Sequence, residues 1–208
     1  MDKIVQIVQH ALSEYTGPEF TELMLEAKHK FFTLTGKLND DDNDYENRMS
    51  SFNDWYLFHF IAQRETRTVI KQYMLNNRID EKVAHAILGF NYSLFEFVGR
   101  KNKKGLCFKD LLHNNKFFLY RDHDHLSLLP GDVFVGRTIS FENQYLMLDG
   151  ICLLANSVKK ILKKECDIVR KYDDKKMEYD FLIKLEFLKS KLKRYNHLGA
   201  DKIFVFSP

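Results

Sequence analysis

The chain has 208 residues, of which 45% are hydrophobic and 29% are charged, and its net charge is +3. This composition fits one globular domain or two small ones and excludes a disordered or low-complexity chain. Its apolar runs are far shorter than the ~20 residues of a membrane-spanning helix, and its first residues lack a signal-peptide pattern. Because none of the three cysteines lies at CxxC spacing, we expect reduced thiols, a cytoplasmic location and no zinc knuckle or disulfide framework.

The first part of the chain follows the helical period. Apolar residues three and four positions apart predict helices over 2–15, 18–35, 45–63, 65–76 and 80–90. The acidic run at 39–46 lacks the central glycine and distal glutamate of an EF-hand, so we interpret it as a loop that starts a helix, with a calcium loop as the alternative.

The predicted helix at 45–63 is apolar nearly all round, which is typical of a helix buried in its domain. Asp54 and His59 lie inside this aromatic run. Because a buried polar side chain needs a partner, we expect these two residues to form an internal polar network. A functional pair is the alternative.

From residue 92 to residue 151 the period changes from about 3.6 to about 2. We expect a small antiparallel meander or barrel of about five strands, over 93–100, 106–112, 116–121, 133–141 and 144–148. Two helices follow, at about 156–171 and 175–195, and the tail from residue 202 is predicted as a last strand. The predicted fold class is α+β, with a helical region (1–91), a β module (92–151) and a C-terminal helical hairpin (152–208) packed as one unit.

Four runs in this order resemble a bacterial family: FNDWYLFHF, YSLFEFVGR, GLCFKDLL and LSLLPGDVFVGRTI. The family is that of proteins of unknown function that often carry a C-terminal SEC-C zinc motif. Their pattern has an F-x-(D/E)-W-(F/Y)-L-F helix, an SLFEV strand and a L-x-x-GD-x-x-x-x-R strand. The resemblance covers about residues 45–151 and implies no activity or site residues. The chain lacks the SEC-C cysteine cluster, so we expect no zinc contact of that kind and no cofactor.

Basic residues supply one candidate site. Residues 156–196 hold 13 Lys and Arg and 7 Asp and Glu, a net charge of +6, whereas the rest of the chain has a net charge of −3. A basic hairpin tip, together with Arg121, could bind a ligand or a nucleic-acid backbone through Arg100, Lys101, Lys103 and Lys104. Nearby aromatic residues could stack on bases: Phe95, Phe97, Phe117, Phe118 and Tyr120. The alternative interpretation is a solvated helix face and aromatic residues that belong to the core.

The run Arg121 to His125 supplies a candidate metal site. On a strand His123 and His125 would share one face, and Asp122 and Asp124 the other. Both residue types are metal ligands. A further ligand would have to come from elsewhere, with His113 and Asp110 as candidates. An ordinary polar turn is the alternative.

The last predicted helix carries an apolar seam: Phe181, Leu185, Leu188 and Leu192. Such a seam packs either on the chain's own core or on a second copy, as in a dimer. Our leading hypothesis is a non-enzymatic cytoplasmic protein-interaction or regulatory protein. The alternative is a nucleic-acid-binding module that uses loop 100–105 and the basic C-terminal helices. A metal-dependent hydrolase at Arg121–His125 is the third.

Overall fold

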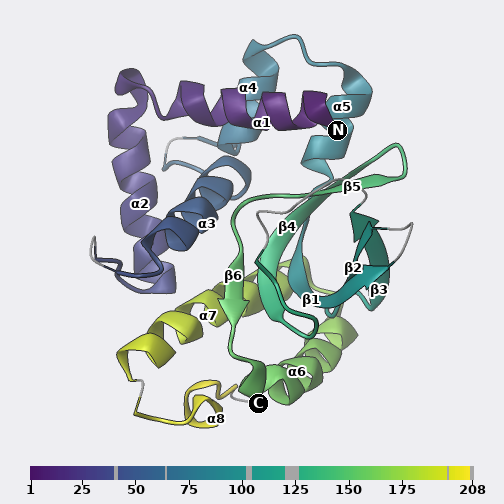
Figure 1. Cartoon of the computed structure of the whole chain (residues 1–208). Coiled ribbons are helices and arrows are strands. Elements are labelled where there is room, and N and C mark those ends of the chain that lie inside the picture. Colours follow the sequence, from purple (N-terminus) through teal and green to yellow (C-terminus); the bar gives the residue numbers. More distant parts are fainter. Residues whose placement is uncertain (40–41, 64, 102–104, 120–126, 196, 207–208) are drawn as a thin grey trace. The chain divides into compact units, whose positions relative to one another are not determined.

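The computed structural model describes residues 1–39, 42–63, 65–101, 105–119, 127–195 and 197–206. They form an α+β fold in which helices precede and follow an antiparallel sheet along the chain (Figure 1), so the predicted fold class is confirmed. The chain divides into two compact units, each assembled from separate segments. The first unit comprises Met1–Thr33, Leu38–Asn91 and Arg137–Gly150, and the second comprises Leu34–Lys37, Tyr92–Gly136 and Ile151–Pro208. Among the described helices, none has the length and apolarity that a membrane span requires.

The N-terminal helices lie close to their predicted ranges. They are α1 (Asp2–Tyr15), α2 (Thr21–Thr35), α3 (Tyr45–Phe58), α4 (Val69–Asn76) and α5 (Glu81–Leu88), with a short 3-10 turn η1 at Pro18–Phe20. The structure ends α3 five residues earlier than predicted. The backbone N–H groups of His59 and Phe60 both bond to the carbonyl of Trp55, and this turn brings the Phe60 ring within 5.6 Å of the Trp55 ring. Phe60 is thereby buried in the core rather than extending the helix.

Helix α3 forms the centre of the first unit, as its apolar surface predicts. Phe52, Trp55 and Tyr56 are each at most 1% exposed. The ring of Phe31, from α2, lies 5.3 Å from the Trp55 ring. The hydroxyl of Tyr56 donates a 2.7 Å hydrogen bond to the carbonyl of Tyr15, the last residue of α1. The same helix therefore joins α1 and α2 through one buried polar contact and a set of aromatic contacts.

The sheet contains β1 (Asn91–Lys101), β2 (Gly105–Asp110), β3 (Asn115–Leu119), β4 (Val133–Phe141), β5 (Gln144–Met147) and β6 (Cys152–Leu154). Five strands, curled as a half-barrel, lie in the order β3-β2-β1-β4-β5, and β6 also pairs with β4. The order departs from a simple meander because β4 lies beside β1 rather than beside β3. In the second unit, the N–H of Gly131, just before β4 begins, donates a 2.7 Å hydrogen bond to the carbonyl of Phe97 in β1. Strand β6 has three residues, too few to show a period in the sequence.

The second unit continues with η2 (Asn156–Val158), α6 (Lys159–Tyr172), α7 (Lys175–Arg194) and α8 (Ala200–Ile203). On the strands of this unit, the rings of Phe95, Phe108 and Phe134 are fully buried. The predicted last strand is wrong, because the tail begins with the short helix α8. Ile203, the last residue of α8, and Phe204, which follows it, are both buried.

Replacing Tyr56 by Phe tests the contact between α3 and α1. We expect a loss of about 1–2 kcal/mol in the free energy of unfolding, because the buried carbonyl of Tyr15 loses its donor. The matched control is Tyr73→Phe, which removes a 3.0 Å contact with His10 that is only partly buried. Chemical denaturation of both variants measures the difference. An equal loss in both would contradict the role given to the Tyr56 hydroxyl.

Candidate protein-docking groove

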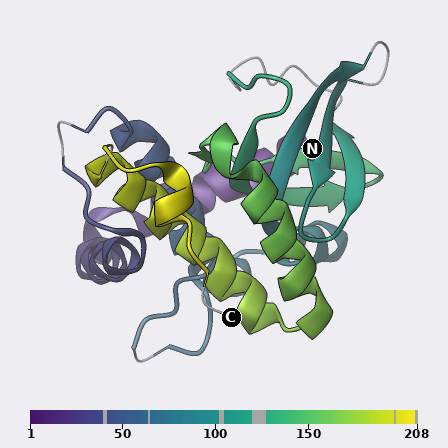
Figure 2. The ribbon, with the colours of Figure 1, turned by 90° about the horizontal axis from the view of Figure 1, so that it is seen from below.

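A groove lies between α6 and α7 in the second unit. The two helices form a hairpin (Figure 2) joined at Asp173, whose φ of 48° is left-handed, and at Asp174, which caps α7 by accepting N–H groups of Lys176 and Met177. The groove has a volume of about 680 Å³. Side chains from both helices and from the C-terminal segment line it, among them Lys164, Ile168, Tyr172, Met177, Asp180, Phe181, Lys184 and Phe206. We call this feature the α6–α7 groove.

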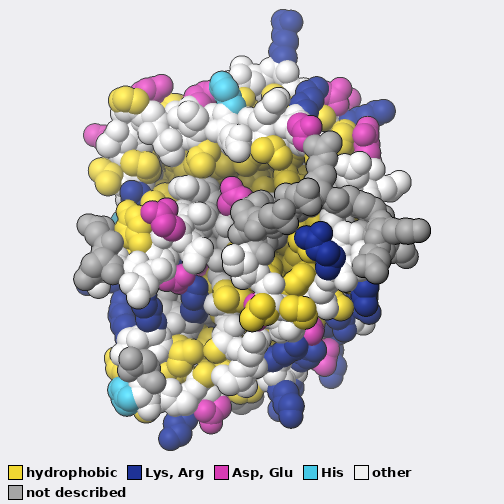
Figure 3. Space-filling model, viewed as in Figure 1, with side chains coloured by type: hydrophobic (Ala, Val, Ile, Leu, Met, Phe, Trp, Pro, Cys, Tyr) yellow, Lys and Arg dark blue, Asp and Glu magenta, His cyan; other side chains and the backbone are white. Residues whose placement is uncertain are grey.

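The groove combines exposed apolar side chains with lysines. Tyr172 is 63% exposed, Ile168 38% and Met177 37%. The ring of Phe206 packs on Phe181 at 5.7 Å, and the ammonium of Lys184 lies 4.9 Å from the centroid of the Phe206 ring. Figure 3 shows Lys and Arg side chains gathered in the lower part of the view, where Figure 1 places α6 and α7. An apolar surface with a charged rim is the usual character of a protein-binding surface.

The predicted apolar seam of α7 is not available to a partner in its central part. Phe181, Leu185 and Leu188 are at most 6% exposed, because they pack into the core of the second unit. Leu192, nearer the end of the helix, is partly exposed. The structure therefore places Phe181, Leu185 and Leu188 in the chain's own core, which is one of the two predicted alternatives, and self-association through the rest of the seam stays a prediction. The exposed apolar side chains of the groove are Ile168 and Tyr172 on α6 and Met177 in the first turn of α7.

The β2–β3 turn anchors the helical hairpin through hydrogen bonds and ion pairs. Asp110 is fully buried, and its carboxylate accepts hydrogen bonds from Ser93 Oγ at 2.6 Å and from the backbone N–H groups of Leu112 and His113. The guanidinium of Arg170, on α6, donates 2.7 Å hydrogen bonds to the carbonyls of Leu111 and Leu112. These contacts satisfy the polar groups of a buried turn and fix α6 against the sheet.

His113 connects the same turn to α7. Its Nδ1 donates to the carboxylate of Asp110 at 2.9 Å, and its Nε2 lies 3.4 Å from the carboxylate of Glu178, which also pairs with Lys175. The hydrogen bond to Asp110 raises the pKa of His113 above its ordinary value of 6.5, and the charges of Asp110 and Glu178 add to the increase, whereas burial and Lys175 oppose it. The charged form of His113 is therefore the one that the fold stabilises.

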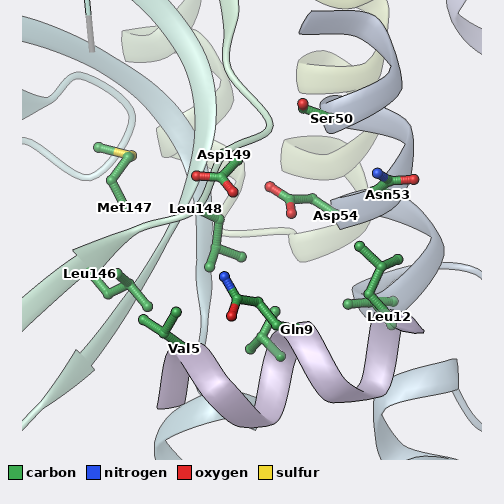
Figure 4. A pocket seen from close by; sticks show the side chains of 12 residues that line it. Val5, Gln9, Leu12, Ser50, Asn53, Asp54, Leu146, Met147, Leu148 and Asp149 are labelled. Atoms are coloured by element: carbon green, nitrogen blue, oxygen red, sulfur yellow. The ribbon is translucent and has the colours of Figure 1, made fainter. Parts of the chain in front are cut away.

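The predicted polar residues of α3 lie in the first unit, and each has its own partner. Asp54 accepts the backbone N–H of Gly150 at 2.9 Å, and His59 Nε2 accepts from Arg137 Nε at 3.1 Å. Burial and the charge of Arg137 lower the pKa of His59 well below its ordinary value, so the ring is neutral and can accept. Asp54 also lines a small pocket of about 120 Å³, in which its carboxylate and that of Asp149 point toward one another (Figure 4).

The basic hairpin tip is described only at its ends. Arg100 and Lys101 are exposed and pair in register with Leu106 and Gly105, whereas Lys103 and Lys104 lie outside the described residues. Three of the aromatic residues predicted for base stacking belong to the core and are at most 6% exposed, namely Phe95, Phe97 and Phe117. Phe118 is partly exposed. Tyr120 lies outside the described residues. The described part of this hairpin therefore turns most of its rings inward, as strands covering a core do.

The predicted metal-binding turn also lies outside the described residues, namely Arg121, Asp122, His123, Asp124 and His125. Within the part of the chain that the structure describes, no three His, Cys, Asp or Glu side chains are grouped so that they could hold a metal ion. Asp110 and His113, the candidates for a further ligand, bond to one another instead. The three cysteines are reduced and buried, and burial raises the pKa of Cys166 to about 12, which keeps it a thiol.

The groove was missed at the sequence level, although one signal pointed to it. Ile168 and Val169 are adjacent apolar residues in α6, and adjacent side chains of a helix point about 100° apart around its axis. Val169 is buried and Ile168 is exposed. Tyr172 follows Ile168 by four residues and therefore lies on the same face.

The sequence model of one protein family matches residues 10–184, which is most of the chain. The chain belongs to the family of unknown function DUF7986. The match includes α6 and the first half of α7, and with them all the groove residues named above except Phe206. No curated protein and no solved structure matches this DUF7986 chain. The resemblance of residues 45–151 to SEC-C-associated proteins stays a prediction.

The His113 contacts predict a pH-dependent contribution to stability. Because the folded state raises the pKa of His113, its stabilisation is complete below the unfolded value of about 6.5 and is lost as the pH rises through the higher folded value. We expect His113→Gln to lower the free energy of unfolding by about 2 kcal/mol near pH 6 and by less near pH 9. Denaturation at both pH values measures this, with the exposed His29→Gln as control. A larger loss at the higher pH would contradict the assignment.

Proposed function

We propose that this protein is a non-enzymatic interaction module that binds a partner protein through the α6–α7 groove. The observation that carries the proposal is the convergence of Ile168, Tyr172 and Met177, all exposed, on one groove of about 680 Å³. Exposed apolar side chains lose contact with water when a partner covers them, which is the main favourable term in protein association. The volume is within the range of sites that receive a ligand or an anchoring side chain.

The geometry favours a protein partner over a nucleic acid. Base stacking needs exposed aromatic rings beside cations, whereas Phe95, Phe97 and Phe117 are used in the core of the β module. On α6, Lys159 and Lys163 pair with Glu96 at 2.7 and 3.0 Å, so these two cations already have a protein anion. A nucleic-acid-binding role for the remaining basic residues of the two helices stays the alternative.

We also propose a cytoplasmic location. The argument is the chemistry of the cysteines: Cys107, Cys152 and Cys166 are reduced, a form that persists in a reducing compartment. A regulatory role would follow from the identity of the partner that the groove binds.

Capture of partners from the native host tests the proposal. The immobilised full chain is compared with a variant that carries Ile168→Gln and Tyr172→Gln, which removes apolar surface without adding charge. We expect at least one protein that the wild type retains to be depleted about tenfold by the variant, because exposed aromatic anchors dominate such interfaces. Quantitative mass spectrometry of the retained proteins measures the ratio.

The matched control is Leu75→Gln, since Leu75 is 62% exposed on α4 in the first unit. It should retain the same proteins as the wild type. If the groove variant and the control retain every protein equally well, the proposal is wrong. Retention of nucleic acid that is lost steeply with salt, with no protein lost in the groove variant, would favour the alternative.

A further inference from the structure

We infer that the small pocket beside Asp54 binds an alkylammonium group, carried either by a free amine or by the end of a lysine side chain. This feature, the Asp54 pocket, is lined by residues of the first unit, whereas the α6–α7 groove belongs to the second. The inference therefore goes beyond the proposed function. Three properties of the pocket carry it: the charge of its lining, the fixed placement of two carboxylates, and its apolar walls.

The lining of the Asp54 pocket is negatively charged. Asp54 on α3 and Asp149, in the segment that follows β5, both line it, and their carboxylates point toward one another (Figure 4). Among the described residues that line the pocket, none is Lys, Arg or His. Two like charges that face one another repel, and a cation placed between them is attracted by both. The charge of the lining therefore favours a cationic ligand.

The backbone holds the two carboxylates in this arrangement. Asp54 is 7% exposed, and its Oδ2 accepts the N–H of Gly150 at 2.9 Å. Gly150 packs so closely on α3 that an added Cβ would lie 2.5 Å from this oxygen and 2.9 Å from the carbonyl oxygen of Ser50. Asp149 precedes Gly150, so the chain itself brings it up to Asp54. A carboxylate can accept about four hydrogen bonds, so Asp54 can hold the Gly150 N–H and also accept from an ammonium.

The other walls distinguish an alkylammonium from an inorganic cation. Most of them are apolar, and the exposed amide of Gln9 adds an acceptor. The apolar lining residues are Val5, Val8, Leu12, Leu57, Leu146, Met147 and Leu148. A metal ion gains nothing from such walls, and within the described part of the chain no three His, Cys, Asp or Glu side chains are grouped to hold one. An aliphatic chain attached to the cation would be buried against them.

The size of the pocket sets the length of that chain. A cavity of about 150 Å³ holds a ring of six carbons. The volume of about 120 Å³ therefore fits a group of about five non-hydrogen atoms. Butylammonium has this size, and so has the side chain of lysine beyond its Cα.

Titration of the full chain with n-butylammonium chloride, followed through the NMR signals of the backbone amides, tests the inference. We expect saturable shifts at Asp54, Asp149 and Gly150 with a Kd of about 1–10 mM, because so few atoms supply only a modest affinity. Butanoate and n-butanol, which replace the positive charge by a negative one or by none, should bind at least about tenfold more weakly. Methylammonium should also bind about tenfold more weakly, because it lacks the apolar chain.

Removal of one carboxylate gives the sharper result. Asp149→Asn should weaken the binding of n-butylammonium about tenfold. The matched control is Glu142→Gln, which removes an exposed carboxylate from the β4–β5 turn of the same unit, outside the pocket lining, and should leave the affinity unchanged. Both positions are exposed, and unchanged signals of the second unit would confirm that each variant is folded.

A blocked lysine, Nα-acetyl-lysine methylamide, distinguishes the two sources of the ammonium. If it binds about as tightly as n-butylammonium, the pocket takes a lysine side chain of a peptide or protein. If n-butylammonium alone binds, the ligand is a free amine. Either result supports the inferred chemistry.

Four results would overturn the inference. The first is the absence of saturable shifts at the pocket with n-butylammonium up to about 100 mM. The second is equal binding of n-butanol, and the third is an equal effect of Asp149→Asn and Glu142→Gln. The fourth is tighter binding of Ca²⁺ or Mg²⁺, tested at about 5 mM, at the same residues, which would make the pocket a metal site.

Discussion

The buried carboxylate of Asp110 organises the second unit. It is fully buried, yet it accepts from Ser93 of β1 and from two backbone N–H groups of the β2–β3 turn. A carboxylate in such a place is tolerated only because hydrogen bonds and a nearby cation replace water. His113 supplies that cation and reaches on to Glu178 of α7, while Arg170 of α6 binds the carbonyls of the same turn. One turn of the sheet therefore holds both helices of the hairpin.

This arrangement explains how a groove can remain open between two helices. Here α6 and α7 are held to the sheet by charged contacts at the hairpin end, and by the burial of Phe181, Leu185 and Leu188 along α7. Ile168, Tyr172 and Met177 are then left on the solvent side of the hairpin. The proposed docking function uses these apolar side chains, which the chain's own core does not cover.

The first unit follows a different principle. Its centre is α3, whose aromatic side chains contact α2 through Phe31 and α1 through the Tyr56 hydroxyl. The polar residues within α3 are each committed to a backbone or side-chain partner, as Asp54 is to Gly150 and His59 to Arg137. In this unit polar groups serve the packing of an aromatic core, whereas in the second unit they position a surface.

The sequence by itself determined the elements. The 3.6-residue period predicted α1 to α7, and the change of period located β1 to β5, because these patterns depend only on which side chains can share a face. Tertiary structure alone decided the rest. Strand β4 lies beside β1 rather than β3, Phe60 leaves α3 to join the core, and Ile203 and Phe204 are buried at the end of a short helix. It also decided that the α7 seam is core and that Ile168 and Tyr172 are surface, because an apolar side chain is buried or exposed according to what packs against it, and its own sequence neighbours do not carry that information.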